Sequence, residues 1–121
     1  MADVNKHARL RKKADFDKVF KKSVKVSNSH FLILIQKTSN QQSRLGLVIS
    51  KKVDKRAVQR NRIKRIIRES FRNYEHIESC DYVVLGRPNI SNINNSELFK
   101  SLNFLWINAQ NKIRTIRKSN E

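Results

Sequence analysis

Two different periods of apolar residues occur along this chain, and they predict where its strands and helices lie. A continuous apolar run at residues 31–35 (FLILI) is typical of a strand buried on both faces, and residues 81–86 (DYVVLG) predict another strand. Residues 45–49 form another short apolar run, and the polar segment TSNQQS before it predicts a hairpin with residues 31–35. Residues 23–28 are the candidate for a short edge strand.

Apolar residues spaced three and four apart predict three helices. The first spans residues 14–22. The second spans about 57–74, with Asp54 as a candidate cap before it, and the third spans about 96–116. The resulting order α-β-β-β-α-β-α predicts an α+β domain, an α/β sandwich with three helices on a small, mostly four-stranded sheet. The stripe of the third helix comprises Leu98, Phe99, Leu102, Leu105, Trp106, Ala109 and Ile113.

The second predicted helix has an apolar stripe beside a cationic face. At about 100° per residue, the apolar residues share one side and the polar ones gather next to it. A folded helix of this kind holds its charge as a fixed surface, whose natural counterpart is a row of phosphates. The apolar residues are Ile63, Ile66, Ile67, Phe71 and Tyr74, and the polar ones are Asn61, Lys64, Arg65, Arg68 and Arg72.

The net positive charge of the chain makes nucleic acid the first candidate for its partner. Among 121 residues, 27 Lys and Arg against 10 Asp and Glu give a net charge of +17, and ten of the basic residues lie between Lys51 and Arg72.

The length predicts a single domain over 1–121, with 1–8 and 117–121 disordered. No apolar run could span a bilayer, no secretory signal is visible, and Cys80 stands alone, so we expect a cytoplasmic protein.

Residues for catalysis or metal binding are sparse. His7, His30 and His76 lack metal-ligand spacing, and the two glycines cannot form a phosphate-binding loop. Asp15 and Asp17 are the only close acidic pair, and we interpret them as helix-start residues rather than metal ligands. A metal-dependent nuclease normally groups several carboxylates. The sequence therefore disfavours a free-standing nuclease.

Two features allow both a structural and a functional interpretation. Phe16 and Phe20 lie one helical turn apart among basic residues, so they could face the core or serve as stacking platforms for unpaired bases. The Arg60-Asn61-Arg62 step could be an ordinary solvated face or a contact surface for RNA. The pattern alone leaves both alternatives open.

Three segments resemble the bacterial ribonuclease P protein subunit. Residues 44–72, RLGLVISKKVDKRAVQRNRIKRIIRESFR, resemble the family signature, in which a strand ending in Ser-Lys-Lys leads into a helix with Arg-Asn-Arg. Residues 8–20, ARLRKKADFDKVF, are similar to its N-terminal segment, and residues 81–88, DYVVLGRP, to its last strand. The resemblance covers about the first 90 residues in the family's order.

The resemblance implies an accessory subunit of an endoribonuclease, with no catalytic residues on this chain. A catalytic RNA would cut precursor tRNA to leave the mature 5′ end, with Mg²⁺ held mainly by RNA, no obligate protein partner, no membrane, and one protein per RNA. The basic helix would lie in a left-handed crossover between parallel strands, against the general rule. The implied contacts with the RNA subunit are Arg60, Asn61, Arg62, Lys64, Arg65, Arg68 and Arg72. The implied cleft for the 5′ leader comprises Phe16, Phe20, Arg9, Lys51 and Lys52.

Two further alternatives share the positive charge. A ribosomal or general RNA-binding protein would not need Phe16 and Phe20 opposite Arg-Asn-Arg. A DNA-binding basic helix would require a zipper or a helix-turn-helix, and no heptads follow Arg72.

Overall fold

The computed structural model describes residues 7–37 and 42–119. It contains one mixed sheet with three α-helices, so the predicted α+β class and order of elements are confirmed, with one short strand added at the start. The elements are β1 (His7–Arg9), α2 (Lys13–Lys21), β2 (Val24–Ser27), β3 (Phe31–Lys37), β4 (Ser43–Val48), α3 (Ala57–Asn73), β5 (Cys80–Gly86), the 3₁₀ turn η1 (Ile90–Asn92) and α4 (Asn95–Ser119).

The strand order in the sheet is β1-β4-β5-β3-β2. β5 pairs in parallel with β4 and antiparallel with β3, so it separates the two strands that the sequence predicted as a hairpin. That prediction is wrong. The hairpin joins β2 to β3 instead, which confirms an edge strand at residues 24–27. β5 takes the central place, where both of its edges are paired and its first five residues are buried.

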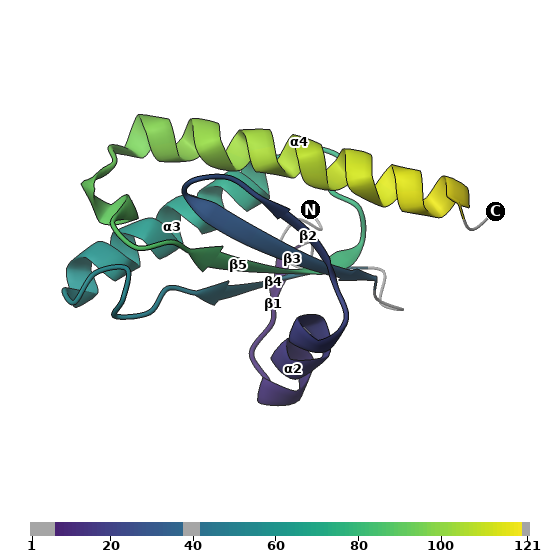
Figure 1. The fold of residues 1–121 in the computed structure, drawn as a ribbon, viewed down its shortest axis with the longest axis horizontal. Coiled ribbons are helices and arrows are strands. Elements are labelled where there is room, and N and C mark those ends of the chain that lie inside the picture. The colour runs from purple at the N-terminus through teal and green to yellow at the C-terminus, as the bar shows by residue number, and fades with distance from the viewer. Residues whose placement is uncertain (1–6, 38–41, 120–121) are drawn as a thin grey trace.

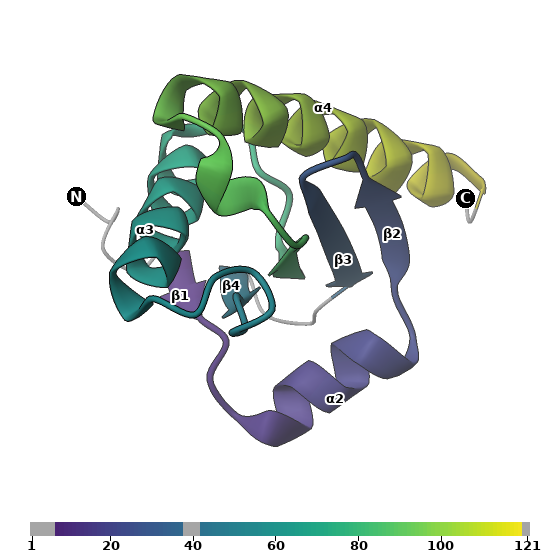
Figure 2. The same ribbon diagram turned by 60° about the vertical axis from the view of Figure 1, so that its left-hand side comes forward.

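Helices cover both faces of the sheet (Figures 1 and 2), α3 and α4 on one face and α2 on the other. Alternate side chains of the central strands therefore enter two separate cores. The larger core contains the edge-to-face rings of Phe71, Tyr82 and Trp106, with centroids 5.3–5.8 Å apart. Cys80 is buried in the same core.

The smaller core lies beneath α2. Leu10, Val19, Leu34 and Val83 form it, and the ring of Phe16 packs against it. Because this core has few members, α2 is held by much less apolar contact than α3 and α4.

Regular elements extend close to both ends of the described residues. Residues 7 and 8 belong to β1, which pairs in parallel with β4, and residues 117–119 belong to the last turns of α4. The remaining terminal residues, and most of the TSNQQS segment, lie outside the described residues.

Candidate nucleic-acid interface

α3 presents the two faces that its sequence predicted. Its four isoleucine and phenylalanine positions at 63, 66, 67 and 71 are buried, and Tyr74 packs partly buried beside them. Asn61, Arg65 and Arg72 are exposed, whereas Lys64 and Arg68 are half-buried. The helix therefore holds a cationic surface rigidly over the larger core.

A hollow of about 320 Å³ opens where α3 faces the segment that leads from β1 into α2. Five of its lining side chains are cationic, five are apolar, and none of the lining residues is acidic. We call it the basic hollow. It is lined by Arg9, Leu10, Arg11, Phe16, Leu45, Leu47, Lys64, Arg68, Phe71 and Arg72.

Like charges meet across the basic hollow. Burial lowers the pKa of the Arg68 guanidinium, and the nearby positive charge of Arg9 lowers it further. β1 creates this proximity, because its parallel pairing with β4 brings Arg9 opposite Leu45. A half-buried Arg68 guanidinium and an exposed Arg9 guanidinium beside apolar side chains form a site in which an anion would relieve repulsion.

The basic hollow joins residues that the sequence assigned to two separate sites. Lys64, Arg68 and Arg72 come from the predicted contacts with the RNA subunit, and Arg9 and Phe16 from the predicted leader cleft. Arg11 also lines the hollow, although sequence analysis did not select it. Its spacing of two residues from Arg9 was the available signal, because alternate residues of an extended segment share a side.

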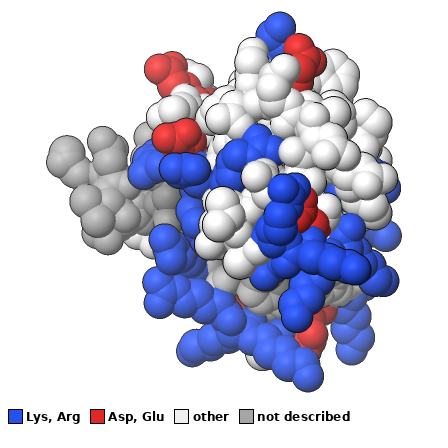
Figure 3. All heavy atoms as spheres, turned by 90° about the vertical axis from the view of Figure 1, so that its left-hand side faces the viewer, with Lys and Arg blue, Asp and Glu red and all other residues white. Residues whose placement is uncertain are grey.

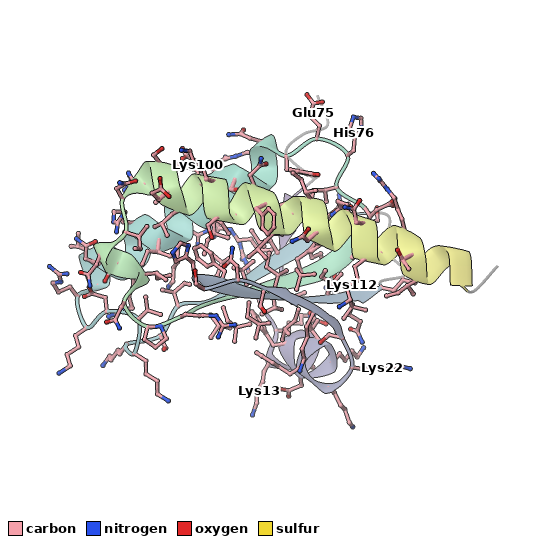
Figure 4. All side chains as sticks on the ribbon, turned by 45° about the horizontal axis from the view of Figure 1, so that its top comes forward. Lys13, Lys22, Glu75, His76, Lys100 and Lys112 are labelled. Carbon is pink, nitrogen blue, oxygen red and sulfur yellow. The ribbon has the colours of Figure 1, made fainter. Side chains whose placement is uncertain are left out.

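The two phenylalanines of α2 occupy different environments. Phe16 is half-buried and packs over Gly46, where an added Cβ would lie 2.7 Å from the Phe16 ring. Phe20 is 47% exposed, and its ring stacks near that of Phe16 at 6.5 Å between centroids. Phe16 therefore packs against the smaller core and also lines the basic hollow, whereas Phe20 faces solvent. Lys13 and Lys22 extend outward at the two ends of α2 (Figure 4).

The other predicted contacts lie toward the start of α3. Arg60 and Arg62 are half-buried, with their guanidinium groups on neighbouring protein atoms, whereas Asn61 is exposed between them. Lys51 and Lys52 are exposed in the connection from β4 to α3 and are not among the residues that line the hollow. Figure 3 shows this end of the molecule, where Lys and Arg crowd the lower half and uncharged side chains cover the upper right.

Asp54 does not cap α3 in the predicted manner. Arg56 occupies the N-cap position without a side-chain cap bond, and the Asp54 carboxylate accepts hydrogen bonds from the Arg56 backbone and guanidinium. The Arg56 guanidinium, then the Arg56 backbone and then the Ser91 side chain hold the pKa of Asp54 well below its usual range. Asp54 therefore shapes the approach to the helix, and its charge is already compensated within the protein.

An ion-pair cluster attaches α2 to the sheet. Arg44 donates two hydrogen bonds to the buried Asp81 carboxylate, at 2.8 and 2.7 Å, and a third to Asp15 at 3.3 Å. The bond to Asp81 is the main cause of a raised Arg44 pKa. Asp15 lies in the first turn of α2, as predicted, but its main described contact is Arg44 rather than the helix terminus.

Within residues 7–37 and 42–119, no group of three or more His, Cys, Asp or Glu side chains is arranged to hold a metal ion. Over the same ranges, no helix is long and apolar enough to cross a membrane.

Comparisons of the sequence and of the fold with known proteins point to one family. The family model Ribonuclease P matches residues 4–110. The ribonuclease P protein component of Marinomonas sp. is 44% identical over 103 residues, 84% of this chain and 78% of the relative. That of Histophilus somni is 40% identical over 116 residues, 95% of each chain.

The similarity extends to solved structures. The Staphylococcus aureus RNase P protein superposes with a TM-score of 0.79 at 34% identity, over 84% of this chain and 94% of that chain. For the Thermotoga maritima RNase P protein the TM-score is 0.71 at 32% identity, over 81% and 94%. With this sequence match, this fold and this cationic helix, the chain belongs to the ribonuclease P protein family, the accessory protein subunits of a tRNA-processing ribonucleoprotein endoribonuclease.

Proposed function

We propose that this protein binds the catalytic RNA of ribonuclease P together with the 5′ leader of precursor tRNA. In doing so, it promotes removal of the leader to give the mature tRNA 5′ end. The observation that supports this proposal best is the basic hollow, in which five cations surround an apolar floor. Cations bind phosphates of any sequence, and apolar or aromatic surface accommodates bases without reading them.

The backbone of a bound RNA would occupy the cationic rim of the hollow. A phosphate placed near Arg9 and Arg68 would replace their mutual repulsion with two attractive contacts. Lys64 and Arg72 extend the same surface along α3, and Arg65 adds an exposed cation beside it. Because α3 and the N-terminal segment line the same hollow, we expect the RNA subunit and the leader to bind one continuous surface of the protein.

The leader would follow the rim toward α2. Phe16 lies at the edge of the hollow, and Phe20 continues the aromatic surface into solvent. A base stacked on such a ring contributes roughly 1–3 kcal/mol whatever its identity, which suits leaders of varied sequence. Lys51 and Lys52 would contribute cations from the connection between β4 and α3.

The hydrolytic step would belong to the RNA partner, with Mg²⁺ held mainly by that RNA and by the substrate. Asp15, Asp54 and Asp81 each form an ion pair with an arginine, so these carboxylates already have cationic partners within the protein. We therefore assign no catalytic side chain to this chain, and we propose a holoenzyme of one protein with one RNA.

Reconstitution tests the proposal directly. The protein should restore cleavage of a precursor tRNA when it is added to a ribonuclease P RNA at Mg²⁺ concentrations where the RNA alone is nearly inactive. The protein without RNA should not cleave. Specific 5′ processing by protein that is rigorously free of RNA would contradict the assignment of catalysis to the RNA.

A charge-matched pair of variants tests the location of the interface. Arg68→Ala should weaken binding to the RNA subunit and reduce the slope of log affinity against log salt by about 0.7–0.9, one phosphate contact. Lys100→Ala removes the same charge from an exposed position on α4 and should leave the slope unchanged. Equal effects of the two substitutions would show that net charge, rather than the basic hollow, determines binding.

A further inference from the structure

The two arginines of the Arg-Asn-Arg step are engaged within the protein. Nη1 of Arg60 donates to the backbone carbonyls of Asp54, at 3.0 Å, and Lys55, at 2.8 Å. Both acceptors belong to residues 51–56, the connection from β4 to α3, which we call the basic loop. Arg60 thus attaches the basic loop to the first turn of the helix that follows it.

Arg62 makes a corresponding attachment on the other side of α3. Its Nε donates to the Gln59 side chain at 2.9 Å, which orients the guanidinium. Nη2 donates to the Ser91 carbonyl at 2.8 Å, and Nη1 donates to the side-chain oxygen of Asn95. Ser91 lies in residues 87–94, which join β5 to α4 and which we call the connector. Arg62 therefore fastens the connector and the first residue of α4 to α3.

One further contact links the two attachments. The Ser91 side chain of the connector acts on the Asp54 carboxylate of the basic loop and helps to hold the pKa of Asp54 below its usual range. The attachments made by Arg60 and Arg62 therefore converge on Asp54 and Ser91, where the basic loop meets the connector. The residues that the basic loop presents to solvent are all cationic, namely Lys51, Lys52, Lys55 and Arg56.

We propose that Arg60 and Arg62 are positioning residues that hold the cations of the basic loop in place for RNA, rather than phosphate contacts themselves. This inference rests on the proposed function, because it assumes that RNA is the partner. All three kinds of nitrogen in the Arg62 guanidinium already donate to protein acceptors. Asn61, exposed between the two arginines, is the side chain of this step that is left to face RNA.

Positioning and direct contact predict different responses to charge-conserving substitution. A phosphate contact requires a cation, so Arg62→Lys would retain most of it. Bonding the Ser91 carbonyl and the Asn95 side-chain oxygen at once requires the planar guanidinium with its two Nη groups. Arg62→Lys should therefore behave like Arg62→Ala. Asn95→Ala provides the complementary variant, since it removes an acceptor of Arg62 without changing any charge. The N-cap of α4 remains intact, because the Asn94 side-chain oxygen still accepts the hydrogen bond from the Glu97 backbone N–H.

The first measurement, of hydrogen exchange and of the melting temperature, is made on the protein without RNA. Amides of Asn92 and Ile93 donate within the connector, so their hydrogen exchange reports its order. Arg62→Ala and Arg62→Lys should each accelerate this exchange at least tenfold and lower the melting temperature by about 5 °C. Asn95→Ala should have a smaller effect in the same direction. Arg65→Ala, on the exposed face of α3, is the matched control and should change neither quantity.

Binding to a ribonuclease P RNA across a salt series gives the second measurement. Arg62→Ala, Arg62→Lys and Asn95→Ala should weaken binding about three- to tenfold with an unchanged salt slope, because the loop cations remain but are no longer held in place. Arg65→Ala should lower the slope by about 0.7–0.9. The uncharged variant Asn95→Ala is decisive, because a merely local structural role would leave its RNA affinity unchanged.

Three results would overturn the inference. A reduced slope for Arg62→Ala, with full affinity for Arg62→Lys and normal exchange in the connector, would establish a direct phosphate contact. Faster exchange without any loss of RNA affinity would restrict the Arg62 attachment to stability. If Arg65→Ala also left RNA binding unchanged, the proposed interface itself would fail, and the positioning role with it.

Discussion

Phe16 and Phe20 have the same chemistry and lie one turn apart, yet the fold treats them differently. Gly46 lacks a side chain where the Phe16 ring lies, so that ring settles against β4 and is half-buried. Phe20, one turn further along α2, remains 47% exposed. Phe20 is therefore the cleaner probe of the leader surface, because its removal leaves little buried space behind.

We expect Phe20→Ala to weaken binding of precursor tRNA to the holoenzyme by about one to two powers of ten, the equivalent of one lost base stack. Affinity for mature tRNA, which has no leader, should barely change, and the melting temperature should stay within a few degrees. Phe16→Ala should show the same discrimination with an added stability loss of about 1–3 kcal/mol from partial burial. Equal losses for precursor and mature tRNA would exclude a leader role for this aromatic pair.

At the scale of elements, α2 depends on one ion-pair cluster as well as on a small core. Arg44 links the buried Asp81 of β5 to Asp15 of α2, the residue that precedes Phe16. The cluster thus helps to orient the aromatic surface. The pair of Arg44 with Asp81 contributes more to stability than the pair with Asp15, because Asp81 is only 4% exposed.

Arg44→Ala should therefore lower the free energy of unfolding by about 2–4 kcal/mol, since it leaves the Asp81 carboxylate buried without its main partner. The value lies below that of a fully buried pair because Arg44 itself is partly exposed. Asp15→Ala should cost under about 1 kcal/mol, as for other partly exposed pairs. Urea unfolding of the two variants measures both, and similar losses would mean that the cluster acts mainly through α2.

The contact of β5 with α4 makes stability sensitive to alkaline pH. The Tyr82 hydroxyl donates to the Glu78 carbonyl and accepts from Gln110, and burial raises the pKa of Tyr82 well above its ordinary value. In the unfolded chain this phenol ionises near pH 10, whereas in the folded protein it stays protonated. Its contribution is thus complete below about pH 10 and is lost as the pH rises further.

Tyr82→Phe removes this titration and leaves the other tyrosine unchanged. The stability advantage of the native protein over the variant should therefore be constant below about pH 9 and should shrink as the pH rises to about 11.5. Urea unfolding at a series of pH values measures this difference. A difference independent of pH would indicate that Tyr82 ionises equally well in the folded protein.

For the whole molecule, the net charge of +17 affects folding and binding in opposite ways. Compaction brings cations together, as at Arg9 and Arg68, so screening by salt should favour the folded state. Binding to RNA releases counterions, so the same salt should oppose it.

We therefore expect the melting temperature to rise, and the affinity for RNA to fall, between about 50 and 300 mM NaCl. The two trends can be recorded on one preparation by calorimetry and by filter binding. A melting temperature that falls with salt would show that attractive ion pairs, such as those of Arg44, outweigh the general repulsion.

The sequence by itself determined the two faces of α3, the α-helices and the strands except β1, because the period of apolar residues is a local property of the chain. The strand order was decided only in the tertiary structure: an apolar run indicates burial but does not specify its neighbours, so the insertion of β5 between β3 and β4 could not be foreseen. The same distinction holds within the site. Arg62 and Arg65 are equivalent by charge and helix membership, but the connector meets only Arg62. Contacts between distant segments determine which cations are engaged within the fold and which remain available to a phosphate.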